Sequence, residues 1–332
     1  MHLDIVKAKS TIPIRQHLGS CCHCHPMMSD FHKLFGSEKL NIETEPRLQI
    51  APLELSLHFP GGDVASGFDF IKQLQLEVEL LKLKVSKRPI KALTIRDPSG
   101  TVSDADLTRL MYIFGKNLCL FNSYNRSYNY ECPPRRLTKN RIALLAGLGF
   151  NHVTLNLSPS ASNSAHFLSG ELKDRLKLYG FIKPSVVLYY GKSTNIANWR
   201  HLITELLHYK PEKIVAQRVC DNSPWPGSAD KAPSDCEGDQ FLLIYSRLKR
   251  AGYRVIGNDC FVAADHELVN AQNNKSLCRT ASGYNALNIN DCLSLGPGAH
   301  GKLGALYYCN WGDFDHYRNA LNYMAREYLC MC

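Results

Sequence analysis

No stretch of this 332-residue chain approaches the run of about 18 consecutive apolar residues that a membrane-spanning helix needs. The first twenty residues also lack an apolar core of signal-peptide length. These absences predict a cytoplasmic protein without membrane insertion. The 13 cysteines, an odd number, fit a reducing compartment in which disulfides are rare.

Motifs that identify common enzyme classes are missing as well. The sequence contains no P-loop, G-x-S-x-G, H-E-x-x-H or G-x-G-x-x-G pattern. The net charge is +9, but the basic residues are dispersed, and their densest run, at 82–91, follows the pattern of a solvated helix end. No RNA- or DNA-binding motif accompanies this run, so we expect no nucleic-acid partner.

Short apolar runs alternate with helix-length amphipathic segments through most of the chain. Strands are predicted at 53–59, 90–95, 128–131, 152–157, 185–190, 213–217 and 253–257, and helices near 70–85, 104–118, 137–148, 170–179, 197–208 and 238–251. Alternation at this spacing predicts an α/β fold, a partial or open (β/α) barrel with parallel strands. Residues 265–304 lack the pattern and are expected to be irregular, before a last helix at 313–329.

The chain contains no long Pro-, Gly- or Ser-rich linker and no charge block that would divide it. We therefore expect three parts around one large core. These are an N-terminal arm over 1–50, a barrel core over 51–260 and a C-terminal extension of the core over 261–332.

An ordered set of short motifs occupies residues 252–304. It comprises GYRVIGND at 252–259, D-x-E-L…A-Q at 265–272, Gly283-Tyr284, and a glycine-rich loop that ends in GPGAHG at 296–301. This order is similar to that of the oxygen-independent coproporphyrinogen III oxidase family, and weaker colinear matches extend upstream. The resemblance implies a barrel of the radical S-adenosylmethionine group, here without the final helical domain of family members.

The resemblance also implies a four-iron cluster held by three cysteines in the loop after the first strand, with S-adenosylmethionine beside it. In this chain the loop reads GGDVASGFD, and the ligand positions fall on Gly62, Ser66 and Asp69. Because none of these residues supplies a thiolate, the sequence predicts that no cofactor is used.

Further positions of the family's cofactor site are changed. The glycine-rich turn after the second strand falls on 95–99, the fourth-strand glutamine on Ser158, and the fifth-strand aspartate on Val187. The third-strand glutamate alone is retained, at Glu131, which is our one candidate cofactor-binding residue. Losses concentrated at one site predict a non-catalytic relative with no catalytic residue.

The segment SCCHCHP is the densest group of potential metal ligands in the chain. It could hold zinc, heme iron or a cluster, although its spacing is not that of a zinc site, and exposed thiols or redox sensing are alternatives. The candidate ligands are Cys21, Cys22, His23, Cys24 and His25.

Three functions are compatible with these observations. The first is a non-catalytic protein that binds a porphyrin or heme, or regulates, in porphyrin and heme metabolism; a basic chain suits such polycarboxylate ligands. The second is an active enzyme that oxidatively decarboxylates coproporphyrinogen III to protoporphyrinogen IX. The third is a degenerate chain without a selected function. We expect the first.

Overall fold

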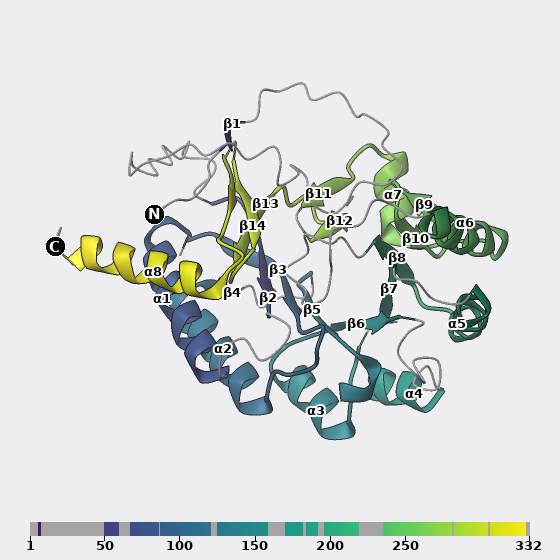
Figure 1. Ribbon diagram of the computed structural model, residues 1–332, viewed down its shortest axis with the longest axis horizontal. Coiled ribbons are helices and arrows are strands. Elements are labelled where there is room, and N and C mark those ends of the chain that lie inside the picture. The colour runs from purple at the N-terminus through teal and green to yellow at the C-terminus, as the bar shows by residue number, and fades with distance from the viewer. Residues whose placement is uncertain are drawn as a thin grey trace.

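The computed structural model describes residues 6–7, 50–59, 67–85, 87–120, 125–158, 170–181, 184–191, 196–218, 235–280, 282–304 and 306–329. Within these residues the chain forms eight α-helices, a 13-stranded sheet and a separate two-stranded hairpin. Figure 1 shows the sheet as a curved wall with helices along its outer side and the hairpin, β11 (Cys278–Thr280) and β12 (Gly283–Asn285), on its inner side.

Seven neighbouring strands of the sheet run parallel to one another. In spatial order they are β13 (Asp291–Leu295), β2 (Leu53–His58), β3 (Pro89–Arg96), β5 (Ser127–Cys132), β6 (His152–Leu157), β7 (Ser185–Tyr190) and β8 (Lys213–Arg218). The described strands at the two ends of the sheet, β1 and β9, do not pair with each other, so the barrel is open. The predicted α/β class and parallel open barrel are confirmed.

Antiparallel strands extend the parallel run at both edges. On one side β8 is followed by β10 (Cys260–Val262) and β9 (Arg254–Ile256), and on the other β13 is followed by β14 (His300–Leu303), β15 (Leu306–Cys309) and β1 (Val6–Lys7). The short strand β4 (Cys119–Leu120) pairs with β3. The run at 253–257, which the sequence placed in the parallel series, thus forms an antiparallel edge strand.

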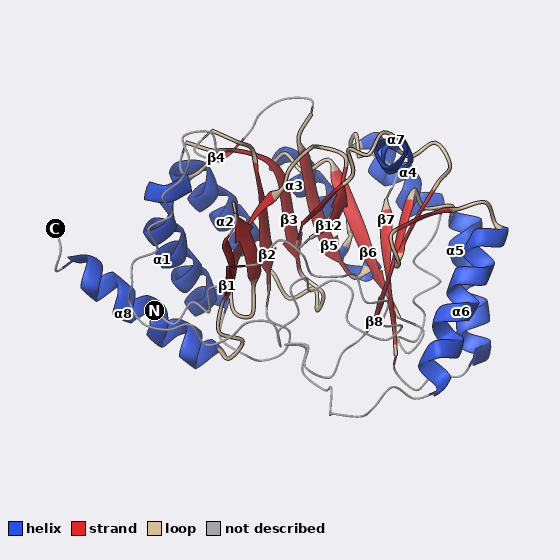
Figure 2. Cartoon of the chain, turned by 90° about the horizontal axis from the view of Figure 1, so that it is seen from above, coloured by secondary structure: helices blue, strands red, loops and turns tan. Residues whose placement is uncertain are grey.

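Helices connect the parallel strands and cover the outer face of the sheet, as Figure 2 shows from above. Ser103 caps the second of them, because its side chain accepts a hydrogen bond of 3.0 Å from the backbone N–H of Asp106. The helices are α1 (Gly67–Val85), α2 (Asp104–Asn117), α3 (Lys139–Gly147), α4 (Gly170–Leu178), α5 (Ile196–Tyr209), α6 (Asp235–Arg250), α7 (Glu267–Asn273) and α8 (Phe314–Leu329), with a 3-10 turn at Pro134–Arg136.

The segment 265–304 departs from the prediction of irregular structure. It contains α7, the β11–β12 hairpin, β13 and β14. Strand β13 is a central element, since it pairs in parallel with β2 from Asp291–Leu53 to Leu295–Leu57. The predicted irregularity is therefore wrong for this part of the chain, although its elements are short.

The parallel strands alternate between apolar and polar side chains, and this alternation places a polar surface inside the barrel. On β2 the residues Leu53, Leu55 and Leu57 are fully buried in the main hydrophobic core, whereas Glu54 and Ser56 occupy the other face. Parallel strands that are covered on both sides are usually apolar throughout. The polar inner face is therefore a functional candidate rather than a requirement of the fold.

Candidate binding site at the two ends of the barrel

A closed polar layer lies at the carboxyl ends of the strands. The Nε of Arg96, the last residue of β3, lies 3.3 Å from Oε2 of Glu131 on β5. The hydroxyl of Tyr189 on β7 donates to Oε1 of the same carboxylate at 3.1 Å. Glu131, the candidate cofactor-binding residue from the sequence, is thus engaged by protein side chains on both oxygens.

The remaining donors of Arg96 are also engaged. Its Nη1 lies 2.7 Å from Nε2 of His58, and its Nη2 donates to the backbone carbonyl of Ser282 at 3.2 Å. Because guanidinium groups only donate, Nε2 of His58 is the acceptor and its imidazole is neutral. Burial, the Arg96 charge and His300 all lower the pKa of His58 well below its usual value, consistent with this assignment.

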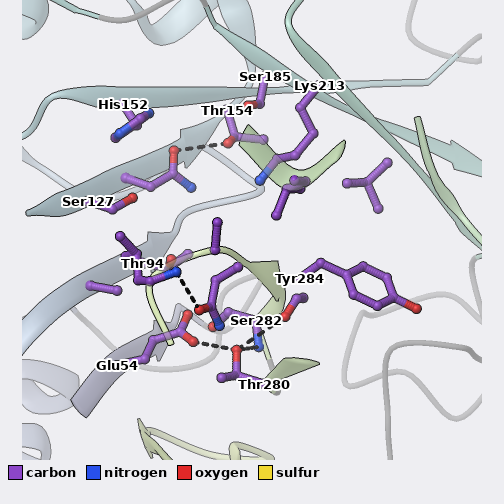
Figure 3. A pocket seen from close by; sticks show the side chains of 18 of the residues that line it. Glu54, Thr94, Ser127, His152, Thr154, Ser185, Lys213, Thr280, Ser282 and Tyr284 are labelled. Atoms are coloured by element: carbon purple, nitrogen blue, oxygen red, sulfur yellow. Dashed lines mark hydrogen bonds between the residues drawn. The ribbon is translucent and has the colours of Figure 1, made fainter. Parts of the chain in front are cut away.

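A cavity of about 610 Å³ extends from this layer to the amino ends of the strands. Figure 3 shows side chains of the barrel strands pointing into it from one side and the β11–β12 hairpin on the other. Four lining residues are each the first residue of a parallel strand, namely Ser127 of β5, His152 of β6, Ser185 of β7 and Lys213 of β8. Alternation sends these residues inward, because Ile214 and Ala216 on β8 are fully buried on the opposite face.

The acidic group nearest the hairpin is held in a buried hydrogen bond. The hydroxyl of Thr280 on β11 donates to Oε2 of Glu54, and this bond ties the hairpin to β2. Burial raises the pKa of Glu54, while hydrogen bonds from Ser282 and Thr280 and the charges of Arg96 and Lys213 oppose that rise.

The residues at which the family's glycine-rich turn was expected mostly contact the hydrophobic core and the segment that leads into α2. Ile95 is fully buried in the core. The carboxylate of Asp97 accepts hydrogen bonds from the backbone N–H groups of Thr101 (2.8 Å) and Val102 (3.1 Å) and from the Tyr130 hydroxyl (2.8 Å). Only Arg96 of this segment reaches the barrel interior, where it lines the cavity.

The other substituted positions lie elsewhere in the site. Val187, at the expected fifth-strand aspartate, lines the cavity and is buried. Ser158 follows the end of β6 and is half-buried. The structure therefore brings Glu131, Arg96 and Val187 to one cavity, and the sequence did not predict that Lys213 and His152 lie there too.

The candidate metal ligands Cys21, Cys22, His23, Cys24 and His25 lie outside the described residues, and the metal or heme site there stays a prediction. In the part of the chain that the structure describes, no group of three or more His, Cys, Asp and Glu side chains could hold a metal ion. The helices of that part include none long and apolar enough to cross a membrane.

A further buried carboxylate joins the C-terminal helix to the barrel. Glu77 of α1 accepts hydrogen bonds from the backbone N–H of Gly296 (3.0 Å), from Asn310 Nδ2 (2.6 Å) and from the hydroxyl of Tyr317 on α8 (2.7 Å). Burial raises its pKa to about 7, although all three hydrogen bonds favour the charged form. Unlike Glu131, this carboxylate is held by neutral donors.

Comparison with known proteins identifies relatives in sequence and in fold. The chain is 23% identical over 346 aligned residues to oxygen-independent coproporphyrinogen III oxidase of Pseudomonas aeruginosa, covering 90% of this chain and 72% of that protein. It is 23% identical over 226 residues to the enzyme of the same name from Helicobacter pylori, covering 61% of this chain and about half (48%) of that protein. No family model matches the chain.

A solved structure shares the fold. Coproporphyrinogen III oxidase from Escherichia coli, a radical SAM enzyme, superposes with a TM-score of 0.68 at 18% identity. The match covers 82% of this chain and 70% of that protein. The open barrel described above is therefore the fold of that enzyme.

These findings overturn the prediction that the chain uses no cofactor. That prediction is wrong, because the proteins that the chain resembles belong to a radical SAM family that uses a 4Fe–4S cluster and S-adenosylmethionine. The aligned positions Gly62 and Ser66 lie outside the described residues, and Asp69 is exposed in the first turn of α1. None of the three is a cysteine, so the described side chains alone do not fit a cluster, and thiolate ligands would come from another part of the chain.

Both lines of comparison agree with the motif order of residues 252–304. The sequence matches run along most of the chain, and the fold of the E. coli enzyme is present. Together they confirm that this chain is similar to oxygen-independent coproporphyrinogen III oxidases in sequence over most of its length and in fold.

Proposed function

We propose that this protein binds a porphyrin or porphyrinogen inside its open barrel, as a component of porphyrin and heme metabolism that does not convert the ligand. The cavity is the single observation that carries the binding role. Its volume of about 610 Å³ is within the range of small-molecule sites, roughly 300–1,000 Å³. A cavity of this volume on the inner side of the sheet can accommodate a ligand of this class.

The chemistry of the cavity wall supports a ligand that is apolar in its body and acidic at its periphery. Val187, Val215 and Leu268 offer apolar contacts, and Lys213 offers a cation for a carboxylate. The net charge of +9 adds a long-range attraction for a polyanionic ligand.

The pairing of Glu131 supports a role without turnover. This glutamate corresponds to a cofactor-binding residue of the family, yet here it is ion-paired with Arg96 and hydrogen-bonded by Tyr189. A cofactor group that needed the carboxylate would have to break a buried ion pair, which is costly. The proposal concerns only the conversion of the tetrapyrrole, and the protein can still bind the family's cofactors.

The second candidate is an active enzyme that oxidatively decarboxylates coproporphyrinogen III. The names of the relatives from P. aeruginosa and H. pylori favour it. Both candidates require the tetrapyrrole to bind, and they differ only in turnover.

Two measurements on the same preparation separate the candidates. Fluorescence titration of coproporphyrin III should reveal saturable binding at one site per chain, and failure to bind would overturn the proposed function. The protein is then reconstituted anaerobically and incubated with S-adenosylmethionine, a reductant and coproporphyrinogen III. Chromatography of the mixture should show that the coproporphyrinogen III is not converted. Formation of protoporphyrinogen IX over several turnovers would establish the second candidate instead.

A further inference from the structure

The ammonium group of Lys213 is an unusual charge in the cavity. Lys213 is half-buried, and Figure 3 shows its side chain reaching from β8 toward the middle of the cavity. Among the interactions of the described residues, no hydrogen bond or ion pair engages this ammonium. By contrast, the cavity-lining Arg96 is paired with Glu131, and the Nε of Arg126 donates to the carbonyl of Gly149 at 3.1 Å.

In the described part of the chain, no carboxylate that lines the cavity forms a hydrogen bond or an ion pair with Lys213. Glu54 accepts from Thr280, and Glu131 is paired with Arg96. Glu212, next to Lys213 in the chain, has its Oε1 3.8 Å from Nε2 of His266. Glu267 lines the outer part of the cavity and is exposed. The Lys213 charge is thus left for a group from outside the chain.

Two histidines beside Lys213 behave as neutral polar groups. Burial and, to a smaller extent, the charge of Lys213 together lower the pKa of both His152 and His266 to about 4. Each uncharged imidazole carries one N–H donor and one acceptor nitrogen. The hydroxyls of Ser127 and Ser185 lie at the same end of the cavity.

We infer that the amino end of the barrel is a carboxylate-binding subsite, in which the Lys213 ammonium pairs with one carboxylate of the bound ligand. The inference rests on the proposed function for the identity of the whole ligand, which would present a propionate side chain here, but the chemistry of the subsite stands by itself. Val187 and Val215, which line the cavity on β7 and β8, would contact the alkyl part of that side chain. The subsite lies at the opposite end of the strands from the Arg96–Glu131 layer.

The charge balance favours a carboxylate over a phosphate. One uncommitted cation matches one negative charge, and the neighbouring imidazoles are neutral donors. A phosphate dianion would carry an excess negative charge close to Glu54 and Glu212, without a second uncommitted cation among the described lining residues. The shared chemistry is an anionic oxygen group, and the experiment below separates the two classes.

The test compares three variants with the full-length wild type. Lys213→Met removes the charge while keeping the length of the side chain, and Lys213→Arg keeps the charge. Lys177→Met removes an equal charge from the exposed outer surface of α4 and serves as the control. With coproporphyrin III as the probe, Lys213→Met should weaken binding about tenfold or more, whereas Lys177→Met and Lys213→Arg should stay within about threefold of wild type. Wild-type affinity in Lys213→Met would overturn the subsite and leave the proposed function standing.

A second measurement tests the subsite without any porphyrin. Thermal unfolding is followed in sodium propionate, in inorganic phosphate and in sodium chloride at matched ionic strength. Propionate should raise the Tm of the wild type and of Lys177→Met above the chloride value, and this rise should vanish in Lys213→Met. A rise in phosphate but not in propionate would overturn the carboxylate assignment, and no rise in either anion would overturn the subsite. A propionate effect without coproporphyrin binding would support the subsite while removing the proposed function.

Discussion

At the carboxyl ends of the barrel strands Arg96 is held by Glu131, His58 and a backbone carbonyl, whereas at the amino ends the Lys213 ammonium points into a cavity without a protein partner. Both ends use polar side chains on the inner face of the same parallel strands. At the carboxyl ends the charges of Arg96 and Glu131 pair with each other. At the amino ends the Lys213 ammonium is available to a ligand. A partly buried charge without a protein partner does not help the fold, so the presence of this charge is more consistent with binding than with folding.

The two ends also differ in their relation to the usual place of chemistry in barrel enzymes. In the E. coli enzyme's fold, here shared at a TM-score of 0.68, the carboxyl ends of the strands are where barrel enzymes place their chemistry. Arg96 neutralises the retained Glu131 at that end, while the cavity below it stays open to the amino ends. The predictions that follow test whether the two ends differ in this way.

The largest effect on stability is expected from removing the Arg96–Glu131 ion pair at the carboxyl ends of the strands. Arg96→Met leaves Glu131 buried with only the Tyr189 hydroxyl, and should lower the free energy of unfolding by about 4 kcal/mol, because a buried carboxylate has lost its ion pair. The double variant Arg96→Met/Glu131→Gln should recover a large part of this loss. Urea denaturation measures both.

A surface ion pair provides the control for this experiment. Arg175→Met removes the partner of Glu171 on α4, where the Glu171 side chain is exposed and that of Arg175 is partly exposed. Its effect should stay below about 1 kcal/mol. A double variant that is as unstable as Arg96→Met alone would show that the pairing with Glu131 is not what Arg96 contributes.

An intermediate effect on stability is expected at Glu77. This carboxylate is held by neutral donors, whereas Glu131 is paired with the cation Arg96. Its pKa in the folded protein, about 7, lies above the ordinary value of 4.5, so the folded state binds the proton more tightly. The associated stability is fully present below about pH 4.5 and is lost as the pH rises through about 7. The loss should reach no more than about 3 kcal/mol.

Glu77→Gln mimics the protonated acid and should remove this part of the pH dependence between pH 5 and 8. The matched control is Glu79→Gln, an exposed position on the same helix, which should keep the wild-type profile. Urea denaturation at a series of pH values measures both variants. Parallel profiles for the wild type and Glu77→Gln would show that Glu77 titrates as an ordinary carboxylate.

The smallest effect is expected on the pKa of the histidines beside Lys213, at the amino ends of the strands. Lys213→Met removes a positive charge that disfavours protonation of His152 and His266, so the pKa of both should rise above about 4. Burial is the larger cause and remains, so the rise should stay below about one pKa unit. NMR titration of the histidine ring protons measures it. Unchanged histidine pKa values would place the ammonium too far from the rings for the proposed subsite.

Local patterns predicted most of the barrel. The predicted strands at 152–157 and 185–190 match β6 and β7 residue for residue. The segment 265–304 was missed because its strands are three to five residues long and its key pairing is remote. Leu295 of β13 pairs with Leu57, far away in the sequence, and no local period encodes that contact.

The site was harder to predict than the fold. Family resemblance led to Glu131 and to the turn around Arg96, but it does not show that these two side chains pair. A usable signal for the other end was present in the sequence, since polar residues alternate with apolar ones along strands that are buried on both sides. Applied to KIVAQR and HVTLNL, that pattern would have placed Lys213 and His152 on the inner face.

The most direct test of this account is a crystal structure of the protein with coproporphyrin III bound. We expect a ligand carboxylate within hydrogen-bond distance of the Lys213 Nζ, about 2.7–3.2 Å, with the Arg96–Glu131 ion pair intact at the other end of the cavity. A ligand seated at the carboxyl ends, with Arg96 drawn away from Glu131 and Lys213 left unengaged, would contradict it.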